Sequence, residues 1–146
     1  QVVILPAWER NTAKRLTNTP KIHFMDNGVL QAILKKKGGM TGNEFESLVI
    51  AEIYKQAKNI FAEVSFHHLR TQDGKEVDLL VENQHGYYAF EIKMAERVSK
   101  IDARHLTGLN TILDKPLLHS FIISNDPETH HISDNITAVH AAMFLG

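Results

Sequence analysis

Apolar residues recur with the period of a helix near position 50 and with the period of strands after position 62. Phe45, Val49, Ile53 and Ala57 fall on one helical face, which predicts an amphipathic helix over residues 43–59. The runs that follow alternate like strands and are separated by the short turns TQDG and NQHG. Such turns join antiparallel neighbours, so we expect a three-stranded meander over residues 63–70, 75–82 and 87–94.

The pattern changes again after residue 98. Ser99-x-x-Asp102 has the form of a capping box and predicts a helix that ends at Lys115-Pro116 and carries Ile101, Leu106, Leu109 and Leu113. The apolar run LLHSFIIS predicts a buried strand parallel to the meander, and ITAVH predicts a last strand. The order from residue 43 to 124 is α-β-β-β-α-β, which predicts an α/β fold with a mixed central sheet flanked by helices.

The first 40 residues are less regular. Pro20 marks a boundary, Ile22 and Phe24 alternate as in a short strand, and the triplet DNG after them predicts a turn. VLQAIL predicts a helix that ends in three lysines and two glycines. Lysines at a helix C-terminus complement the helix dipole and glycine can cap it, so we interpret the three lysines as a solvated helix end rather than a DNA-binding patch. We therefore expect residues 1–40 to be a lead-in segment that packs on a core domain at residues 41–146.

The composition narrows the class of protein. The 146 residues suit one compact domain, and no stretch is long or apolar enough to span a membrane. The absence of cysteine suits a reducing compartment, so we expect a cytoplasmic protein. The net charge of −1 argues against a dedicated nucleic-acid surface and leaves room only for a local patch.

Two further expectations come from the first residues of the chain and from the lack of a glycine-rich phosphate-binding motif. The chain opens QVVILPAWER, with neither an initiator Met nor a signal peptide, and we interpret it as a fragment of a longer protein. No phosphate-binding loop of the form G-x-x-x-x-G-K-[ST] occurs, so we expect this piece not to bind ATP itself.

Three charged residues sit where the meander is expected to be half buried. Glu91 and Lys93 alternate with Ile92 and so share one face of their strand. Asp78 lies in the preceding strand, and the tight NQHG turn brings the two strands within roughly 5 Å across the ladder. Two carboxylates at that spacing repel each other unless a cation lies between them, and Mg²⁺ or Mn²⁺ is the natural choice.

Other side chains extend this hypothesis. Lys93 would stabilise charge that builds up on the attacking oxygen or the phosphate, as phosphodiester hydrolysis requires. Glu46 points with the apolar stripe of the first helix, whereas Glu44 points away, so Glu46 is the expected additional acid. Basic side chains near the site in sequence could contact phosphates, although such residues are more often solvated: Arg70, Arg97, Lys100 and Arg104.

Simpler readings remain open for each group. The three charges could form a surface salt-bridge cluster on an exposed sheet face, and Glu46 could pair with a nearby Lys or Arg. Glu76 and Glu82 share a strand face with Asp78, but a solvated position is expected for each. The pairs His67-His68 and His130-His131 point to opposite faces of a strand, so we expect no zinc site from either pair.

With these residues in place, the chain resembles the PD-(D/E)XK nuclease superfamily, which has an acid in the second strand and E-x-K in the third. Asp78, Glu91, Lys93 and Glu46 match its motif positions, while Val77 stands where the superfamily has Pro. The chain is similar above all to a nuclease-like domain of unknown function that follows an AAA-type ATPase domain in bacterial and archaeal proteins. The segments that carry this likeness are LPAWERNTAKRLTNTPKIHFMDNGVL, GNEFESLVIAEIYKQ, DGKEVDLLVE, FEIK and AVHAAMFLG.

The resemblance implies a restriction endonuclease-like core and an N-terminal ATPase domain as a partner. It also implies a Mg-dependent DNA nuclease, in which Asp78 and Glu91 hold the metal and Lys93 and Glu46 are catalytic. The alternative is a catalytically silent accessory domain that keeps the fold to bind DNA or protein for the ATPase, because folds outlive their chemistry.

Overall fold

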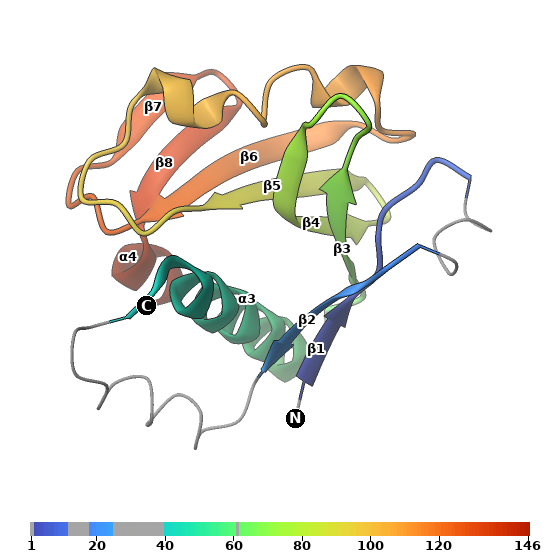
Figure 1. The fold of residues 1–146 in the computed structure, drawn as a ribbon, viewed down its shortest axis with the longest axis horizontal. Coiled ribbons are helices and arrows are strands. Elements are labelled where there is room, and N and C mark those ends of the chain that lie inside the picture. The colour runs from blue at the N-terminus through green and yellow to red at the C-terminus, as the bar shows by residue number, and fades with distance from the viewer. Residues whose placement is uncertain (1, 12–17, 25–39, 61) are drawn as a thin grey trace.

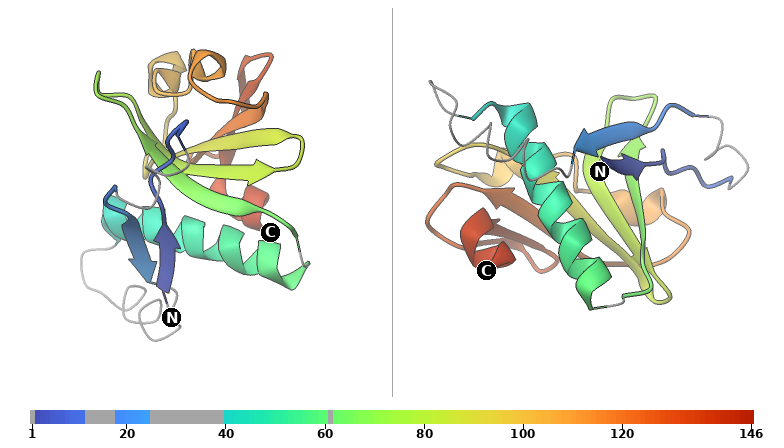
Figure 2. Two further views of the ribbon diagram at one scale, coloured as in Figure 1. Left: turned by 90° about the vertical axis from the view of Figure 1, so that its right-hand side faces the viewer. Right: turned by 90° about the horizontal axis from the view of Figure 1, so that it is seen from below.

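A six-stranded mixed sheet forms the centre of the molecule, in the order β3-β4-β5-β6-β8-β7 (Figure 1). This computed structural model describes residues 2–11, 18–24, 40–60 and 62–146. Helices α3 (Gly42–Asn59) and α4 (Ala141–Leu145) cover one face, and the short 3-10 helices η1 (Lys100–Ala103) and η2 (Leu109–Thr111) lie over the other (Figure 2). The expectation of an α/β fold with a mixed sheet is confirmed.

Helix α3 forms where the apolar period predicts it. Thr41 caps its N-terminus, because the Thr41 hydroxyl accepts a hydrogen bond of 3.2 Å from the backbone N–H of Glu44. The buried residues Phe45, Val49 and Ile50 pack against the sheet together with Leu79, Phe90, Ile92 and Ile123. The helix therefore presents a fixed face to the middle strands.

The meander consists of β3 (Ser65–Arg70), β4 (Glu76–Asn83) and β5 (Gly86–Ile92), all antiparallel as expected. The β3–β4 turn contains Gly74 at a φ of 91°, a left-handed conformation that favours glycine. In the β4–β5 turn, Asn83 Oδ1 accepts hydrogen bonds from the backbone N–H groups of His85 and Gly86 at 2.8 and 3.0 Å. The second turn fixes the register of β4 against β5, with Asn83 opposite Gly86.

Strand β6 (Leu117–Ser124) pairs in parallel with β5, which confirms the expected crossover. Strand β8 (Ile136–His140) pairs in parallel with β6 and matches the ITAVH prediction. Strand β7 (His130–Ser133) was not predicted, and it pairs antiparallel with β8 at the sheet edge. The described part of the chain contains no helix that is both long and apolar enough to cross a membrane.

The connection between β5 and β6 differs from the predicted helix at residues 99–115. The capping box of Ser99 and Asp102 is present, but only two 3-10 turns follow it. Gly108 adopts a φ of 73°, which no helix interior allows, and the Thr107 hydroxyl donates back to the Arg104 carbonyl at 3.0 Å. The apolar residues still reach the core, since Ala103, Leu106, Leu109 and Leu113 are buried.

The N-terminal segment contributes β1 (Val2–Leu5) and β2 (Lys21–Phe24), which form a separate two-stranded antiparallel sheet beside α3 (Figure 1). Trp8 anchors this segment to the core: its indole N–H donates to the Tyr87 hydroxyl at 2.9 Å, and Tyr87 donates to Asp114 at 2.6 Å. The helix predicted for VLQAIL, the DNG turn and the three lysines lie outside the described residues.

Candidate metal centre

Asp78 occupies an irregular position near the start of β4. Between the pairs His67–Leu80 and Leu69–Val77, β4 places two residues, Asp78 and Leu79, opposite one residue of β3. A bulge of this kind re-aims a side chain and loosens the local ladder. The sequence gives no sign of it, because Leu79, Leu80 and Val81 are all apolar and so do not mark which face of the sheet each side chain takes.

The carboxylate of Asp78 reaches across to β5. Regular pairing of β4 with β5 ends at Leu79 and Phe90, and beyond it Asp78 Oδ2 accepts a hydrogen bond of 2.7 Å from the backbone N–H of Ile92. The side chain thus replaces a ladder contact where the strands separate. Burial raises the pKa of Asp78, and this hydrogen bond opposes the rise.

Glu91 is the neighbour of Asp78 across the strands, because continuing the register from Leu79 and Phe90 brings positions 78 and 91 together. Burial raises the pKa of Glu91 to about 8, and the charges of Asp78 and Glu46 add to the rise. Among the described residues, no hydrogen bond or ion pair holds the Glu91 carboxylate. A buried carboxylate beside other acids holds its proton well above the usual range.

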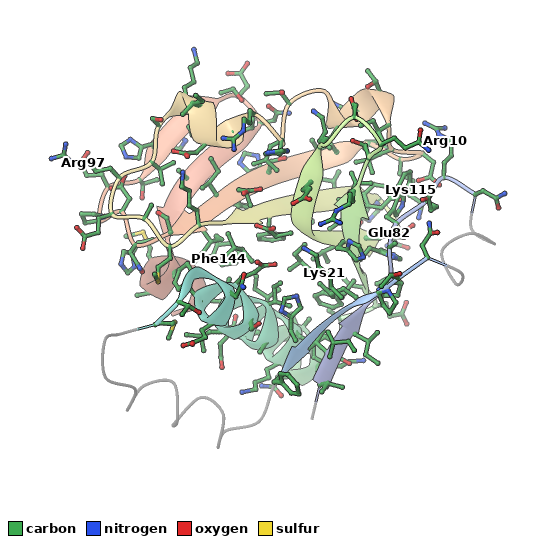
Figure 3. All side chains as sticks on the ribbon, in the orientation of Figure 1. Arg10, Lys21, Glu82, Arg97, Lys115 and Phe144 are labelled. Carbon is green, nitrogen blue, oxygen red and sulfur yellow. The ribbon has the colours of Figure 1, made fainter. Side chains whose placement is uncertain are left out.

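Glu46 completes a group of three acids that we call the acidic cluster: Glu46, Asp78 and Glu91. It projects from α3 on the side of Val49 and Ile50, as the helical spacing predicts, and its side chain is only 18% exposed. Burial and the nearby Asp78 raise the pKa of Glu46 to about 7. Lys21 of β2 gives partial compensation, with its Nζ 3.9 Å from Glu46 Oε1; the lysine lies between the small sheet and the main sheet (Figure 3).

When all three acids are ionised, the acidic cluster carries more negative charge than Lys21 alone neutralises. Lys21 is the cation within ion-pair distance among the described residues, and all three acids have raised pKa values. Oxygen donors at such a site suit a hard divalent cation. In residues 2–11, 18–24, 40–60 and 62–146, however, no three acidic or histidine side chains are grouped as a complete metal site. The acidic cluster could therefore hold a cation through one or two carboxylates, with water as the other ligands, which is the usual arrangement for Mg²⁺.

Lys93 lies just beyond the end of β5. Its backbone N–H continues the ladder by donating to the Ile123 carbonyl at 2.9 Å. Its ammonium forms an ion pair with Asp102 Oδ1 from η1. Lys93 also lowers the pKa of Glu91, a minor effect beside burial, so its charge acts on the acidic cluster.

Asp102 is buried and held firmly. Its Oδ2 accepts a hydrogen bond of 2.8 Å from the backbone N–H of Ser99, and its Oδ1 accepts a hydrogen bond from the Lys93 ammonium. Burial acts to raise the pKa of Asp102, but the hydrogen bonds from Lys93 and Ser99 outweigh it and lower the pKa. The sequence identified Asp102 only as a helix cap. Nothing in its spacing from Lys93 indicates the ion pair, because the pair depends on the 3-10 turn.

The basic residues named from the sequence are dispersed. Arg104 lies near enough to Glu91 for its charge to lower the pKa of that carboxyl. Lys100 is exposed at the start of η1. Arg97 projects at the edge of the molecule (Figure 3), where it lines a depression of about 410 Å³ with Asp126 and His130. Of Arg97, Lys100 and Arg104, the structure therefore brings only Arg104 near the acidic cluster.

A histidine that the sequence analysis missed also lies near the acids. His105 Nδ1 accepts a hydrogen bond of 3.0 Å from the backbone N–H of Glu76, so the proton of the neutral ring is on Nε2. Charge on His105 would lower the pKa of Asp78. The sequence analysis missed His105 because the pattern of apolar residues in the Ser99–Leu113 segment does not indicate that this side chain points toward β4.

The two other acids of β4 have partners of their own. Glu76 forms an exposed ion pair with Arg70 at 2.9 Å. Glu82 is half buried and pairs with Lys115 at 2.8 Å (Figure 3) and with His67 at 3.3 Å. Neither residue joins the acidic cluster as a neighbour of Glu91, although the charge of Glu76 adds to the rise in the pKa values of Asp78 and Glu46.

Fold and site together define a mixed α/β domain with an acidic cluster where two central strands separate. The chain belongs to the family described as a domain of unknown function, DUF4143, whose model matches residues 41–144. It is similar to the uncharacterized protein Mb2031c of Mycobacterium bovis and the uncharacterized protein Rv2008c of Mycobacterium tuberculosis. Each is 27% identical over 148 residues, which cover 97% of this chain and 32% of the relative.

The chain thus spans about a third of the length of the curated relatives it matches. No solved structure matches the chain.

Proposed function

We propose that this domain is a Mg- or Mn-dependent phosphodiesterase of the PD-(D/E)XK type that cleaves DNA. The observation that carries the proposal is the acidic cluster. Glu46, Asp78 and Glu91 come from three elements, are partly buried, and have one cation within ion-pair distance among the described residues, Lys21. The pKa values of all three are raised. Strongly raised pKa values in a small group of acids are typical of functional sites rather than of structural ion pairs.

The residues have distinct roles in this proposal. Asp78 and Glu91 hold the divalent cation, and Asp78 is oriented for that task by the Ile92 backbone N–H. Glu46 orders the attacking water or the ion. When bound, the cation polarises the phosphate and lowers the pKa of water.

Lys93 supplies positive charge next to the acids. It stabilises the negative charge that develops on the attacking oxygen and on the phosphate, and Asp102 holds its ammonium in place. Arg104 is close enough to act on the same charge, so it is the basic residue we assign to the substrate phosphate. Lys100 and Arg97 are assigned weaker contacts with more distant phosphates, since Lys100 is exposed on η1 and Arg97 projects at the edge of the molecule (Figure 3).

We also propose that the domain works as part of a longer protein with an ATPase domain. The support is the resemblance described above together with the length of the relatives, of which the match covers 32%. The cytoplasm remains our proposal for its location.

A silent accessory domain is the second candidate, and two observations favour it. The ammonium of Lys93 is already engaged by a buried aspartate, and the net charge of −1 offers little to attract DNA. In that case Lys93→Ala would leave the biological activity unchanged, whereas substitutions at Arg97, Lys100 and Arg104 would impair it. A loss of function from Lys93→Ala in a folded protein would exclude this candidate.

The nuclease proposal is tested by calorimetric titration with Mn²⁺ and then by a cleavage panel of single-stranded, duplex and branched DNA. We expect Asp78→Ala and Glu91→Ala to weaken Mn²⁺ binding and cleavage by about 100-fold or more, because each removes a ligand. The exposed acid Glu128 provides a control, and Glu128→Ala should change neither. Absence of both metal binding and cleavage in the folded wild-type protein would refute the proposal.

A further inference from the structure

The outer face of the β1–β2 sheet is apolar. Val2 pairs with Phe24 and Ile4 pairs with Ile22 across the two strands, and all four side chains are 45–60% exposed. We call these four residues the outer apolar face. Because side chains alternate along a strand, the residues between them point the other way, and Val3, Leu5 and His23 are buried.

Apolar side chains therefore occupy both faces of this small sheet. A two-stranded sheet with one covered face normally carries polar residues on the other, since water solvates that side. The other large exposed apolar side chains in the described residues are scattered over separate elements: Ile60, Met94, Ile101 and Met143. A contiguous cross-strand patch is the feature that marks an interaction site, whereas single exposed residues do not.

The size of the patch bears on what covers it. Its exposed fractions amount to an area on the order of 400 Å², which is about half of the roughly 800 Å² per partner that a stable complex between free molecules buries. A second copy of this chain would gain too little from this face alone. A segment on the same polypeptide needs less area, because its tether supplies a high effective concentration.

The relatives provide such a segment. The match with the two mycobacterial proteins covers 97% of this chain but only 32% of theirs, so most of each relative lies outside the domain. We propose that the outer apolar face docks an apolar segment of the same polypeptide from outside residues 1–146, and so joins this domain to a neighbouring one. This docking is independent of the metal chemistry.

The occupant is defined by the chemistry of the face. Three aliphatic side chains and one phenyl ring offer no hydrogen-bond partner, so the segment must present aliphatic or aromatic side chains without charge.

Site-specific photo-cross-linking in the full-length protein tests the proposal. Phe24 is replaced by p-benzoylphenylalanine, and the control places the same group at Ile101, which is 69% exposed on η1 on the other side of the main sheet (Figure 2). We expect the probe at position 24 to give an intramolecular cross-link to a peptide outside residues 1–146 and the control to give none. A cross-link to a second molecule, a cross-link within residues 1–146, or no cross-link above the control would overturn the proposal.

A second measurement covers the case in which the probe disturbs the fold. Ile22→Asp should increase the rate of proteolysis between the two domains of the full-length protein about tenfold or more, because it places a charge in the interface. The matched variant Ile101→Asp should leave that rate unchanged. Equal rates for the two variants would contradict the docking.

Discussion

Glu46 in the acidic cluster and Glu82 at the far end of β4 are buried to nearly the same extent, at 18% and 16% side-chain exposure. Their surroundings differ. Glu82 has Lys115 at 2.8 Å and His67 at 3.3 Å. Within the part of the chain that the structure describes, the one cation at ion-pair distance from Glu46 is Lys21 at 3.9 Å, and Glu46 shares its site with Asp78 and Glu91. One site is an ion pair, and the other is a group of acids that repel one another.

The two sites differ in what they contribute: the ion pair of Glu82 stabilises the fold, whereas the acidic cluster destabilises it. A partly buried ion pair that is complete in the folded protein costs stability when one partner is removed. A cluster of acids with raised pKa values lowers the stability of the folded protein at neutral pH and is retained for another reason, such as cation binding.

Mn²⁺ affinity should depend strongly on pH at the acidic cluster. Because Glu46 and Glu91 have pKa values of about 7 and 8, a bound cation must displace protons below pH 8, and the affinity should rise roughly tenfold per pH unit for each displaced proton. Titrations between pH 6 and pH 8 measure the slope. Glu82→Gln should keep that slope and Glu91→Gln should reduce it, while a flat profile in the wild type would show that the acids do not bind the ion.

Charge removal should have opposite effects on stability at the two sites. Glu82→Gln should lower the free energy of unfolding by about 1–2 kcal/mol, since Lys115 and His67 lose their partner but Lys115 is partly solvated. Glu91→Gln should be neutral or stabilising at pH 8. Urea unfolding in the presence of a chelator compares them, and equal destabilisation by both variants would remove the contrast.

Asp102→Asn tests how Lys93 is held. Without the carboxylate, the ammonium loses its anchor and we expect turnover in the cleavage reaction to fall about tenfold at unchanged KM, with an altered alkaline limb of the pH profile. The matched control is Asp126→Asn, because Asp126 is similarly buried and also accepts a backbone hydrogen bond, from Val98 at 2.8 Å, but faces no lysine. An equal loss in both variants would point to a general effect on folding.

The metal-free protein should become less stable as the pH rises from 5 to about 8. Glu46 and Glu91 bind more protons in the folded than in the unfolded state in this window, so the stabilisation that they give near pH 5 is lost as they ionise. The lowered pKa values of His23 and His68 act in the opposite direction and are the same in both variants compared below. A loss of about 1 kcal/mol would lower Tm by roughly 3 °C. Glu91→Gln should flatten the profile, and a Glu91→Gln profile that runs parallel to the wild-type profile would contradict the assignment.

Local patterns in the sequence predicted the elements that local physics determines. The period of Phe45, Val49 and Ile53 gave α3, and the NQHG turn fixed the register that places Asp78 opposite Glu91. The same spacing indicated that Glu46 points inward, as it does. These inferences succeed because helix period, strand alternation and turn length act over a few residues.

The sequence did not predict the features that depend on contacts between distant parts of the chain. The capping box at Ser99 predicted a helix, but Gly108 and packing of Leu106 and Leu109 on the sheet favour two 3-10 turns. The ion pair of Lys93 with Asp102 depends on those turns. The contact of Lys21 with Glu46 joins a strand and a helix that are far apart in the sequence. Strand β7 was missed because HHIS has no apolar alternation and is defined by its pairing with β8.

The most direct measurement is anomalous diffraction at the manganese edge from crystals grown at pH 8 with Mn²⁺. We expect a peak about 2.1–2.2 Å from carboxylate oxygens of Asp78 and Glu91, and no peak there in Glu91→Gln crystals. Ordered Asp78 and Glu91 side chains without a metal peak between them, or manganese bound only at Glu82, would contradict the account.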